Sequence, residues 1–124
     1  MLQKQNSPIQ SAHDTFARKK ILDQELARCL DVLKTKWNPK KVILFGTMAK
    51  GEVSEWSDID LVVVEETSLP FYQRLYQVRK LLRPQVAMDV IVYTPDEFET
   101  MCAERAFMKD EVVDHGKVLY ERSA

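Results

Sequence analysis

The chain has 124 residues, of which 45% are hydrophobic and 30% charged, and its 18 basic and 19 acidic residues leave a net charge of −1. This size and composition are typical of one globular domain spanning residues 1–124. The charge balance excludes a broad nucleic-acid-binding surface, and no run approaches the ~20 apolar residues of a membrane helix. Cys29 and Cys102 lie far apart without a CxxC pair, so we expect two reduced thiols and a cytoplasmic location.

The N-terminal quarter predicts one amphipathic helix after a polar end. Residues 1–11 are polar and contain Pro8, so we expect them to be disordered or frayed. From His13 to Trp37, apolar residues recur at spacings of three and four, which indicates a helix with one buried stripe. Asn38-Pro39 ends this helix, because the residue before proline disfavours helical dihedral angles.

The middle of the chain predicts two buried strands joined by a glycine-containing loop. The apolar run Lys41 to Phe45 reads as a strand that stops at Gly46-Thr47. Residues 46–50 are expected to form a turn that leads into a short helix, and residues 51–57 a loop. The second strand is expected to run from Asp58 to Glu65.

The C-terminal half alternates helices and strands. In its first helix we expect Arg74 on a solvated basic face, and Tyr72 and Tyr76 in packing positions. The later helix at Thr94 carries the sequence of a capping box that closes at Glu97. The predicted elements are a helix from Leu69 to Arg83, a strand from Gln85 to Tyr93, a helix from Thr94 to Glu104, a helical piece from Phe107 to Asp114 and a strand from Lys117 to Glu121.

Three aspartates form the candidate reactive centre. Because side chains alternate along a strand, Asp58 and Asp60 share one face. Carboxylates side by side repel unless a cation lies between them, and oxygen ligands favour Mg²⁺. Asp89 is the only charge in the run VAMDVIVY, where an unpartnered carboxylate is unfavourable. If the second and third strands pair, Asp89 lies near the other two and can accept the proton of an attacking hydroxyl.

The glycine turn supplies the candidate nucleotide-binding residues. Gly46 lets the backbone turn sharply and approach a phosphate closely. Thr47 offers a hydroxyl at a predicted helix start, where free N–H groups favour anions. For Lys50 two interpretations stay open, a solvated lysine or a phosphate ligand. Ser57 is expected to cap the turn before the aspartates.

These residues resemble a known signature. Gly46-Thr47, ten further residues and then Asp58-Ile59-Asp60 are similar to the G-S-x10-D-x-D pattern of the nucleotidyltransferases of the DNA polymerase beta superfamily. The short chain looks like the minimal nucleotidyltransferase branch, and the resemblance covers about residues 42–93. Thr47 stands where serine is usual and Lys50 where arginine is usual, which keeps the hydroxyl and the charge but loses the bidentate fork.

The resemblance implies both a fold class and a set of roles. The fold is α/β (α+β), a small mixed β-sheet flanked by helices, as in polymerase-beta-like nucleotidyltransferases. The implied roles are a catalytic triad that binds Mg²⁺ (Asp58, Asp60 and Asp89) and a site for the triphosphate of ATP or another nucleotide (Gly46 and Thr47, with Lys50 and Ser57 as further candidates).

The resemblance also implies an activity and a partner. We expect an enzyme that transfers a nucleoside monophosphate, AMP from ATP, to a hydroxyl of a partner macromolecule. Minimal relatives commonly act as antitoxins paired with a helical HEPN-domain toxin, which makes such a protein the expected partner. Two alternatives stay open: an antitoxin that acts by binding alone, and a nucleotidyltransferase for small molecules such as antibiotics that works as a homo-oligomer.

Overall fold

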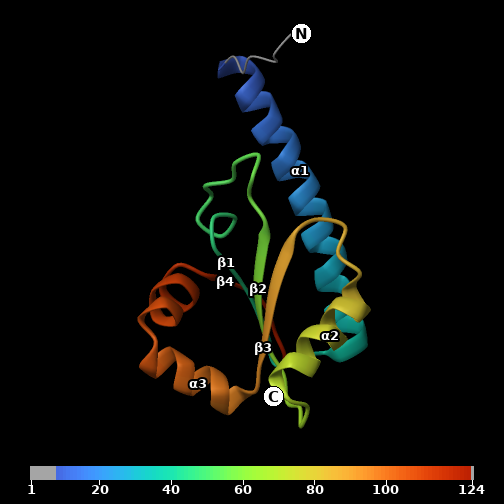
Figure 1. Ribbon diagram of the computed structural model, residues 1–124, viewed down its shortest axis with the longest axis vertical. Helices are drawn as coiled ribbons and strands as arrows, with labels where there is room; N and C mark the ends of the chain where they lie inside the picture. The colour runs from blue at the N-terminus through green and yellow to red at the C-terminus, as the bar shows by residue number, and fades with distance from the viewer. Residues whose placement is uncertain (1–7, 124) are drawn as a thin grey trace.

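The computed structural model describes residues 8–123, with side chains from Asp14 onward. Its elements form one mixed sheet flanked by helices, as the sequence predicts (Figure 1). In chain order they are α1 (Pro8–Val32), the π-helical segment η1 (Leu33–Trp37), β1 (Lys41–Phe45), β2 (Ile59–Val64), α2 (Phe71–Leu82), β3 (Met88–Tyr93), α3 (Pro95–Glu104), the π-helical segment η2 (Met108–Asp114) and β4 (Lys117–Glu121).

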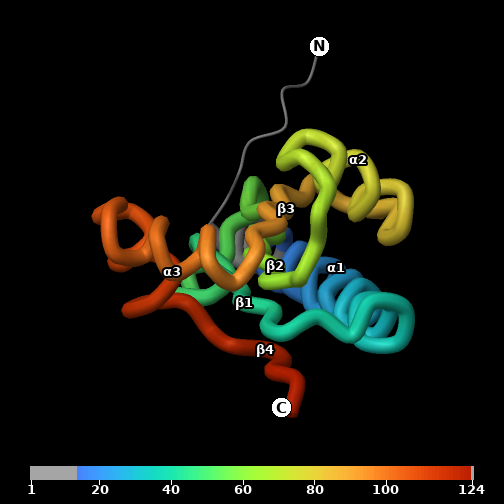
Figure 2. The backbone as a smooth tube through the Cα atoms, turned by 90° about the horizontal axis from the view of Figure 1, so that it is seen from below, coloured from blue at the N-terminus to red at the C-terminus, as the bar shows by residue number. Residues whose placement is uncertain are grey.

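The sheet has the strand order β3-β2-β1-β4. β1 runs antiparallel to both of its neighbours, β2 and β4, whereas β2 and β3 are parallel and are connected through α2. Helices α1 and α2 lie over one face of the sheet, and α3 with η2 lies over the other (Figure 1 and Figure 2). Because β1 runs antiparallel to β2, the first residues of β2 and β3 lie at the same end of the sheet as the last residue of β1.

Both faces of the sheet are buried, which explains why its central strands read as continuous apolar runs. Alternate residues of β1 and β2 point to opposite sides, and each side packs against its own helices. The α1–α2 side holds Leu22, Cys29, Val42, Leu44, Ile59, Leu61, Val63, Val78, Leu82, Met88, Val90 and Val92. The α3–η2 side holds Ile43, Phe45, Val62, Val64, Tyr93, Met108 and Val112.

The predicted bounds agree with the structure to within one or two residues except in three places. α1 begins at Pro8, so residues 8–11 are helical although the sequence predicts a frayed end; residues 1–7 lie outside the described part of the chain. β3 begins at Met88 rather than at Gln85. The short helix predicted for residues 46–50 does not form. That segment instead forms consecutive turns closed by backbone hydrogen bonds.

Arg74 is buried, which contradicts its predicted place on a solvated face. It lies one and two helical turns before Val78 and Leu82, on the stripe of α2 that faces the sheet. Its guanidinium donates to the carbonyls of Leu69 and Val92 and makes two bonds to the carboxylate of Glu97. The positive charge is thus compensated, and it ties α2 to the first turn of α3.

Two further expectations can be compared directly. The capping box at Thr94 and Glu97 forms as predicted. Tyr72 and Tyr76 are 69% and 71% exposed, so the prediction that they pack is wrong. They lie on the side of α2 that is opposite to Arg74 and faces away from the sheet.

The ion pair between Arg74 and Glu97 predicts a pH-dependent contribution to stability. Hydrogen bonds from Arg74 and from the Thr94 backbone hold the pKa of Glu97 below its ordinary value. A lowered folded-state pKa gives stability that is present at neutral pH and is lost as the pH falls through that pKa. We expect Glu97→Gln to lower the free energy of unfolding by about 1–2 kcal/mol at pH 7.

Urea denaturation of Glu97→Gln at pH 7 and pH 3 measures this contribution. The loss should shrink towards zero at pH 3. Glu99→Gln, on the exposed side of the same helix, is the matched control and should change little at either pH. Equal losses in the two variants at pH 7 would contradict the assignment.

Candidate active site

Two of the three candidate aspartates lie side by side on neighbouring parallel strands. Asp60 on β2 is the register partner of Asp89 on β3, so both side chains leave the sheet on the same face. Asp60 is partly buried and Asp89 is exposed. The sequence expectation that strand pairing brings these two residues together is thus met.

Asp58 lies directly before β2, although the sequence predicts it as the first residue of that strand. Its side chain is 44% exposed, and one carboxylate oxygen, Oδ1, lies 4.0 Å from Nη2 of Arg18 on α1. It is still close enough to Asp60 for its charge to raise the pKa of that carboxyl group. The three carboxylates therefore form one electrostatic group, although only two of them are adjacent.

Gly46 provides the space that the Asp60 carboxylate occupies. Phe45 is the register partner of Asp60, which places the following glycine directly beside the aspartate. A Cβ atom built on Gly46 would lie 2.3 Å from Oδ2 of Asp60, and Gly46 has a φ of +79°. Glycine is required here for two independent reasons, the positive φ and the close approach of a carboxylate.

Crowding of acidic groups shifts the ionisation of Asp60. Burial is the largest cause, and repulsion from Asp89 and then Asp58 adds to it, so that the pKa of Asp60 rises to about 6. The charged form of Asp60 still predominates at pH 7, but folding makes it less favourable than it is in the unfolded chain. A cation bound between these carboxylates would reverse that penalty.

The donor set fits a hard divalent cation in its chemistry. Three carboxylates supply the oxygen ligands that Mg²⁺ prefers, and the raised pKa of Asp60 indicates uncompensated negative charge. Among the side chains that the structure describes, however, no three acidic, His or Cys groups converge closely enough to hold a metal ion as they stand. Binding of an ion by all three would require these side chains to move, including that of Asp58, whose Oδ1 lies 4.0 Å from Nη2 of Arg18.

The loop between β1 and β2 is held together by Ser57. The hydroxyl of Thr47 donates to Oγ of Ser57 over 3.0 Å, and the backbone N–H of Ser54 donates to the same atom over 2.8 Å. Ser57 itself is only 5% exposed. It therefore links the glycine turn to the start of the segment that carries Asp58, the next residue. Because no helix follows Gly46, the anion-binding argument from a helix N-terminus does not apply to Thr47.

Lys50 is engaged in an internal ion pair. Its Nζ donates to Oε1 of Glu111 on η2 over 2.8 Å, and this hydrogen bond raises the pKa of the lysine. The contact joins the glycine turn to the opposite wall of the site. The sequence leaves two interpretations of Lys50 open, a solvated lysine or a phosphate ligand. The structure shows a third arrangement, in which Lys50 forms an ion pair with Glu111.

A cavity of about 770 Å³ opens beside the carboxylates. Its floor comes from the ends of β1, β2 and β3, and its walls come from α2 on one side and η2 on the other. The sequence analysis missed the wall residues, although three of them recur at a spacing of four along α2. The residues that line the cavity are Phe45, Gly46, Thr47, Asp60, Phe71, Leu75, Arg79, Met88, Asp89, Val90, Ile91, Phe107 and Glu111.

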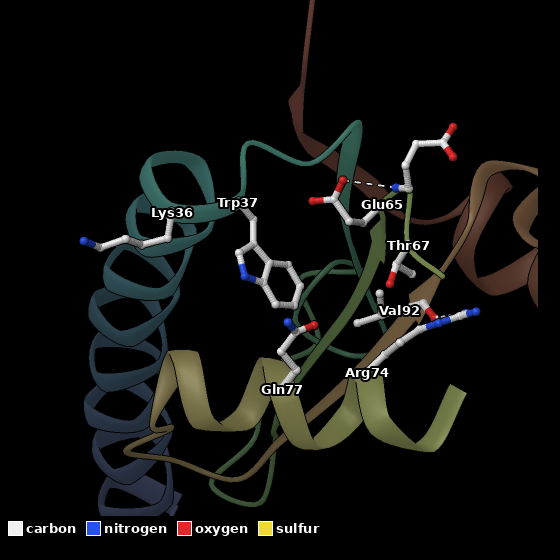
Figure 3. Close-up of a pocket in the computed structure, with 8 residues that line it drawn as sticks. Lys36, Trp37, Glu65, Thr67, Arg74, Gln77 and Val92 are labelled. Carbon is white, nitrogen blue, oxygen red and sulfur yellow. Dashed lines mark hydrogen bonds between the residues drawn. The ribbon is translucent and has the colours of Figure 1, made fainter. Parts of the chain in front are cut away.

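A second, smaller cavity of about 320 Å³ lies past the opposite end of β2 (Figure 3). Trp37, Gln77 and Arg74 border it together with Glu65, which follows the last residue of β2. Glu65 lies five positions after Asp60, or roughly 16 Å along an extended strand. The guanidinium of Arg74 is already bonded to Glu97 and Val92, so the acidic centre and its cavity at the other end are the better site for chemistry.

A family model, two relatives and a solved structure all indicate similarity to nucleotidyltransferases. The model of the nucleotidyltransferase domain family matches residues 26–119. A protein of Methanocaldococcus jannaschii named as a protein adenylyltransferase is 30% identical over 100 residues, which cover 79% of this chain and 97% of that protein. A second protein of that organism with the same designation is 28% identical over 80 residues, or 64% of this chain and 80% of the relative.

A solved structure agrees at the level of the fold. The crystal structure of a Sulfolobus solfataricus protein named as a nucleotidyltransferase superposes with a TM-score of 0.63 and covers 88% of each chain. Sequence identity in this superposition is 19%, so the likeness establishes a shared architecture.

The close contact at Gly46 predicts a difference between two glycine substitutions. Gly51 has a similar positive φ of +73°, but a Cβ atom there meets nothing within 4 Å. Gly51→Ala should therefore lower the free energy of unfolding by about 1–2 kcal/mol through backbone strain alone. Gly46→Ala should lose about 1–3 kcal/mol more, because the methyl group collides with Asp60.

A double-mutant cycle with Asp60→Ala separates strain from collision. In that background the cost of Gly46→Ala should fall to that of Gly51→Ala, because the colliding carboxylate is gone. Chemical denaturation of all five proteins measures the cycle. A cost of Gly46→Ala that is unchanged in the Asp60→Ala background would contradict the proposed contact.

The raised pKa of Asp60 predicts how stability without added metal depends on pH. The folded-state pKa of Asp60, about 6, lies above the ordinary aspartate pKa of 3.8, so the folded protein binds the proton more tightly. This destabilisation is fully present above pH 6 and is relieved as the pH falls towards 4. We expect Asp60→Asn to raise the melting temperature at pH 8 and to have no such advantage at pH 4.

Thermal melting in EDTA at both pH values checks this prediction. Asp31→Asn, on the exposed surface of α1, is the control for removal of an acidic charge. A stabilisation by Asp60→Asn that is the same at pH 8 and pH 4 would show that the carboxylates do not repel as described.

Proposed function

The chain belongs to the nucleotidyltransferase domain family, and from that premise we propose that it transfers AMP from ATP to a hydroxyl group of a partner protein, with release of pyrophosphate. The observation that carries the proposal is the in-register pairing of Asp60 and Asp89 beside the Gly46 turn. The choice of AMP and of a protein acceptor is supported by the two relatives that are named as protein adenylyltransferases.

Mg²⁺ is the proposed cofactor, held by Asp58, Asp60 and Asp89. The support is the oxygen donor set and the unfavourable charge on Asp60, which a divalent cation would offset. When bound, the ion would neutralise negative charge on the triphosphate and stabilise the charge that develops as the phosphoryl group transfers. Most of the rate enhancement then comes from positioning and electrostatic stabilisation.

The side chains of the site divide into proposed roles. Asp89 is exposed and lies beside Asp60 at the cavity floor, where it can accept the proton of the attacking hydroxyl. The hydroxyl oxygen bonds to the α-phosphorus, the bond from that phosphorus to the bridging oxygen breaks, and pyrophosphate leaves. The Gly46 backbone and the Thr47 hydroxyl line the cavity next to Asp60, where they can orient the triphosphate.

The apolar walls of the cavity would exclude water from the reaction. Phe71 and Leu75 on α2 and Phe107, which directly precedes η2, line the same cavity as the carboxylates. Removing water strengthens the electrostatic interactions within the site and protects ATP from hydrolysis. The acceptor is proposed to be a separate protein, which the two relatives named as protein adenylyltransferases support.

A small helical protein of the HEPN type is the proposed acceptor, and this chain would be the antitoxin of that pair. The support is the resemblance of the Gly46 to Asp60 segment to minimal nucleotidyltransferases. Modification of the partner would then be the means of neutralising it.

An antitoxin that acts by binding alone is the second candidate. It is favoured by one observation: both a predicted phosphate ligand and a predicted metal ligand are engaged internally. Lys50 pairs with Glu111, and Asp58 faces Arg18. If these contacts persist in the presence of nucleotide, the site does not turn over.

Transfer of label from α-³²P-ATP tests the proposal. The protein is incubated with Mg²⁺, labelled ATP and the product of the adjacent gene, and then analysed by gel and mass spectrometry. We expect label on the neighbouring protein, and a loss of at least about a hundredfold in Asp58→Asn, because a metal ligand is removed.

Asp31→Asn serves as the control and should transfer normally. Tight association of the two proteins without label, unchanged in Asp58→Asn, would favour the binding antitoxin. Label only on an added aminoglycoside would favour a small-molecule substrate and contradict the protein acceptor.

A further inference from the structure

Helix α1 extends past the core and contacts the loop that presents the first aspartate (Figure 1). Arg18, in the N-terminal half of α1, donates from Nε and Nη2 to the backbone carbonyl of Ser57 over 3.2 and 3.0 Å. The two residues are 39 positions apart in the sequence. Both bonds go to one oxygen atom, which fixes the guanidinium against the loop.

Ser57 is consequently held on both sides. Its hydroxyl accepts from Thr47 and from the Ser54 backbone, and its carbonyl accepts from Arg18. Asp58 is the next residue, and its side chain is 44% exposed while the residue before it is buried. The backbone that carries Asp58 is therefore fixed, whereas its carboxylate is free to turn.

The charge of Arg18 faces that carboxylate. Nη2 of Arg18 lies 4.0 Å from Oδ1 of Asp58, and the Arg18 side chain is only 24% exposed. Exposed ion pairs usually contribute little, because both side chains are mobile. Here the arginine is held in place by its bonds to the Ser57 carbonyl, so its charge stays beside Asp58 whether or not the carboxylate points to it.

We propose that Arg18 is a positioning residue that also sets the metal affinity of the site. It fixes the turn that presents Asp58, and its charge is the internal cation with which a divalent ion must compete for that carboxylate. When Asp58 turns to the ion, Arg18 remains on the Ser57 carbonyl and its positive charge continues to oppose the second cation. This inference rests on the proposed function only in assigning a divalent ion to the carboxylates.

Binding of Mn²⁺, measured by electron paramagnetic resonance without nucleotide, tests the inference separately from turnover. Arg18→Gln removes the charge, whereas Arg18→Lys keeps it. We expect Arg18→Gln to bind Mn²⁺ about fivefold more tightly, the size of effect that unit charges 4 Å apart have in high-dielectric surroundings. Arg18→Lys should stay within about twofold of the parent protein.

Lys19→Gln is the matched control. It removes a positive charge from the next residue of α1, where the lysine pairs with Asp23 in an exposed position. Its Mn²⁺ affinity should be unchanged. Thermal melting in EDTA establishes that all three variants are folded before their affinities are compared.

Transfer of labelled AMP gives the second readout. Both Arg18 variants should lower kcat and leave KM for ATP unchanged, because neither reproduces the two bonds that fix Ser57. Unchanged Mn²⁺ affinity in Arg18→Gln overturns the inference, as does weakening of equal size in both Arg18 variants. Normal Mn²⁺ effects without any transfer by the parent protein would uphold the inference and contradict the proposed function.

Discussion

Repulsion between two carboxylates on adjacent parallel strands is the constraint on which this end of the molecule depends. Asp60 and Asp89 are register partners, and burial together with their mutual repulsion raises the pKa of Asp60 to about 6. The contacts around them accommodate this charge. Gly46 has no side chain, which leaves room for the Asp60 carboxylate, and Arg18 lies beside Asp58. A domain that keeps such an unfavourable group is expected to use it, which is why the site and the family assignment support each other.

The apolar core is what makes the repulsion tolerable. The strand residues on either side of Asp60 and Asp89 are buried against α1 and α2, among them Ile59, Leu61 and Val90. A slip of one residue in the pairing of β2 and β3 would turn these apolar side chains towards the wrong face. The hydrophobic register therefore holds the acidic pair together against its own electrostatics. Stability and the proposed function are linked through the same strands, because the residues that pack and the proposed catalytic residues alternate along them.

The sequence identified the acidic residues that the fold brings together, but it did not identify the residues that support them. The sequence predicted that Asp89 would lie near Asp60 if the second and third strands paired, as they do, and the capping box at Thr94 was readable from local chemistry. The short helix expected after Gly46 failed, because local propensity there is overridden by the turns that join the loop to Ser57. Arg74 was assigned to the solvated side of its helix, because the sequence alone does not show that folding brings Glu97 within hydrogen-bonding distance of it.

The contacts that sequence alone missed are those between distant segments. Arg18 with Ser57 and Lys50 with Glu111 join segments that are 39 and 61 residues apart.

We propose above all that the carboxylates at the Gly46 turn bind a divalent cation together with a nucleotide. A crystal structure with Mn²⁺ and a non-hydrolysable ATP analogue, with anomalous data, tests it most directly. We predict an anomalous peak in contact with Asp58, Asp60 and Asp89 and a triphosphate beside Gly46. Nucleotide in the Trp37 cavity, with no peak at the aspartates, would contradict the account.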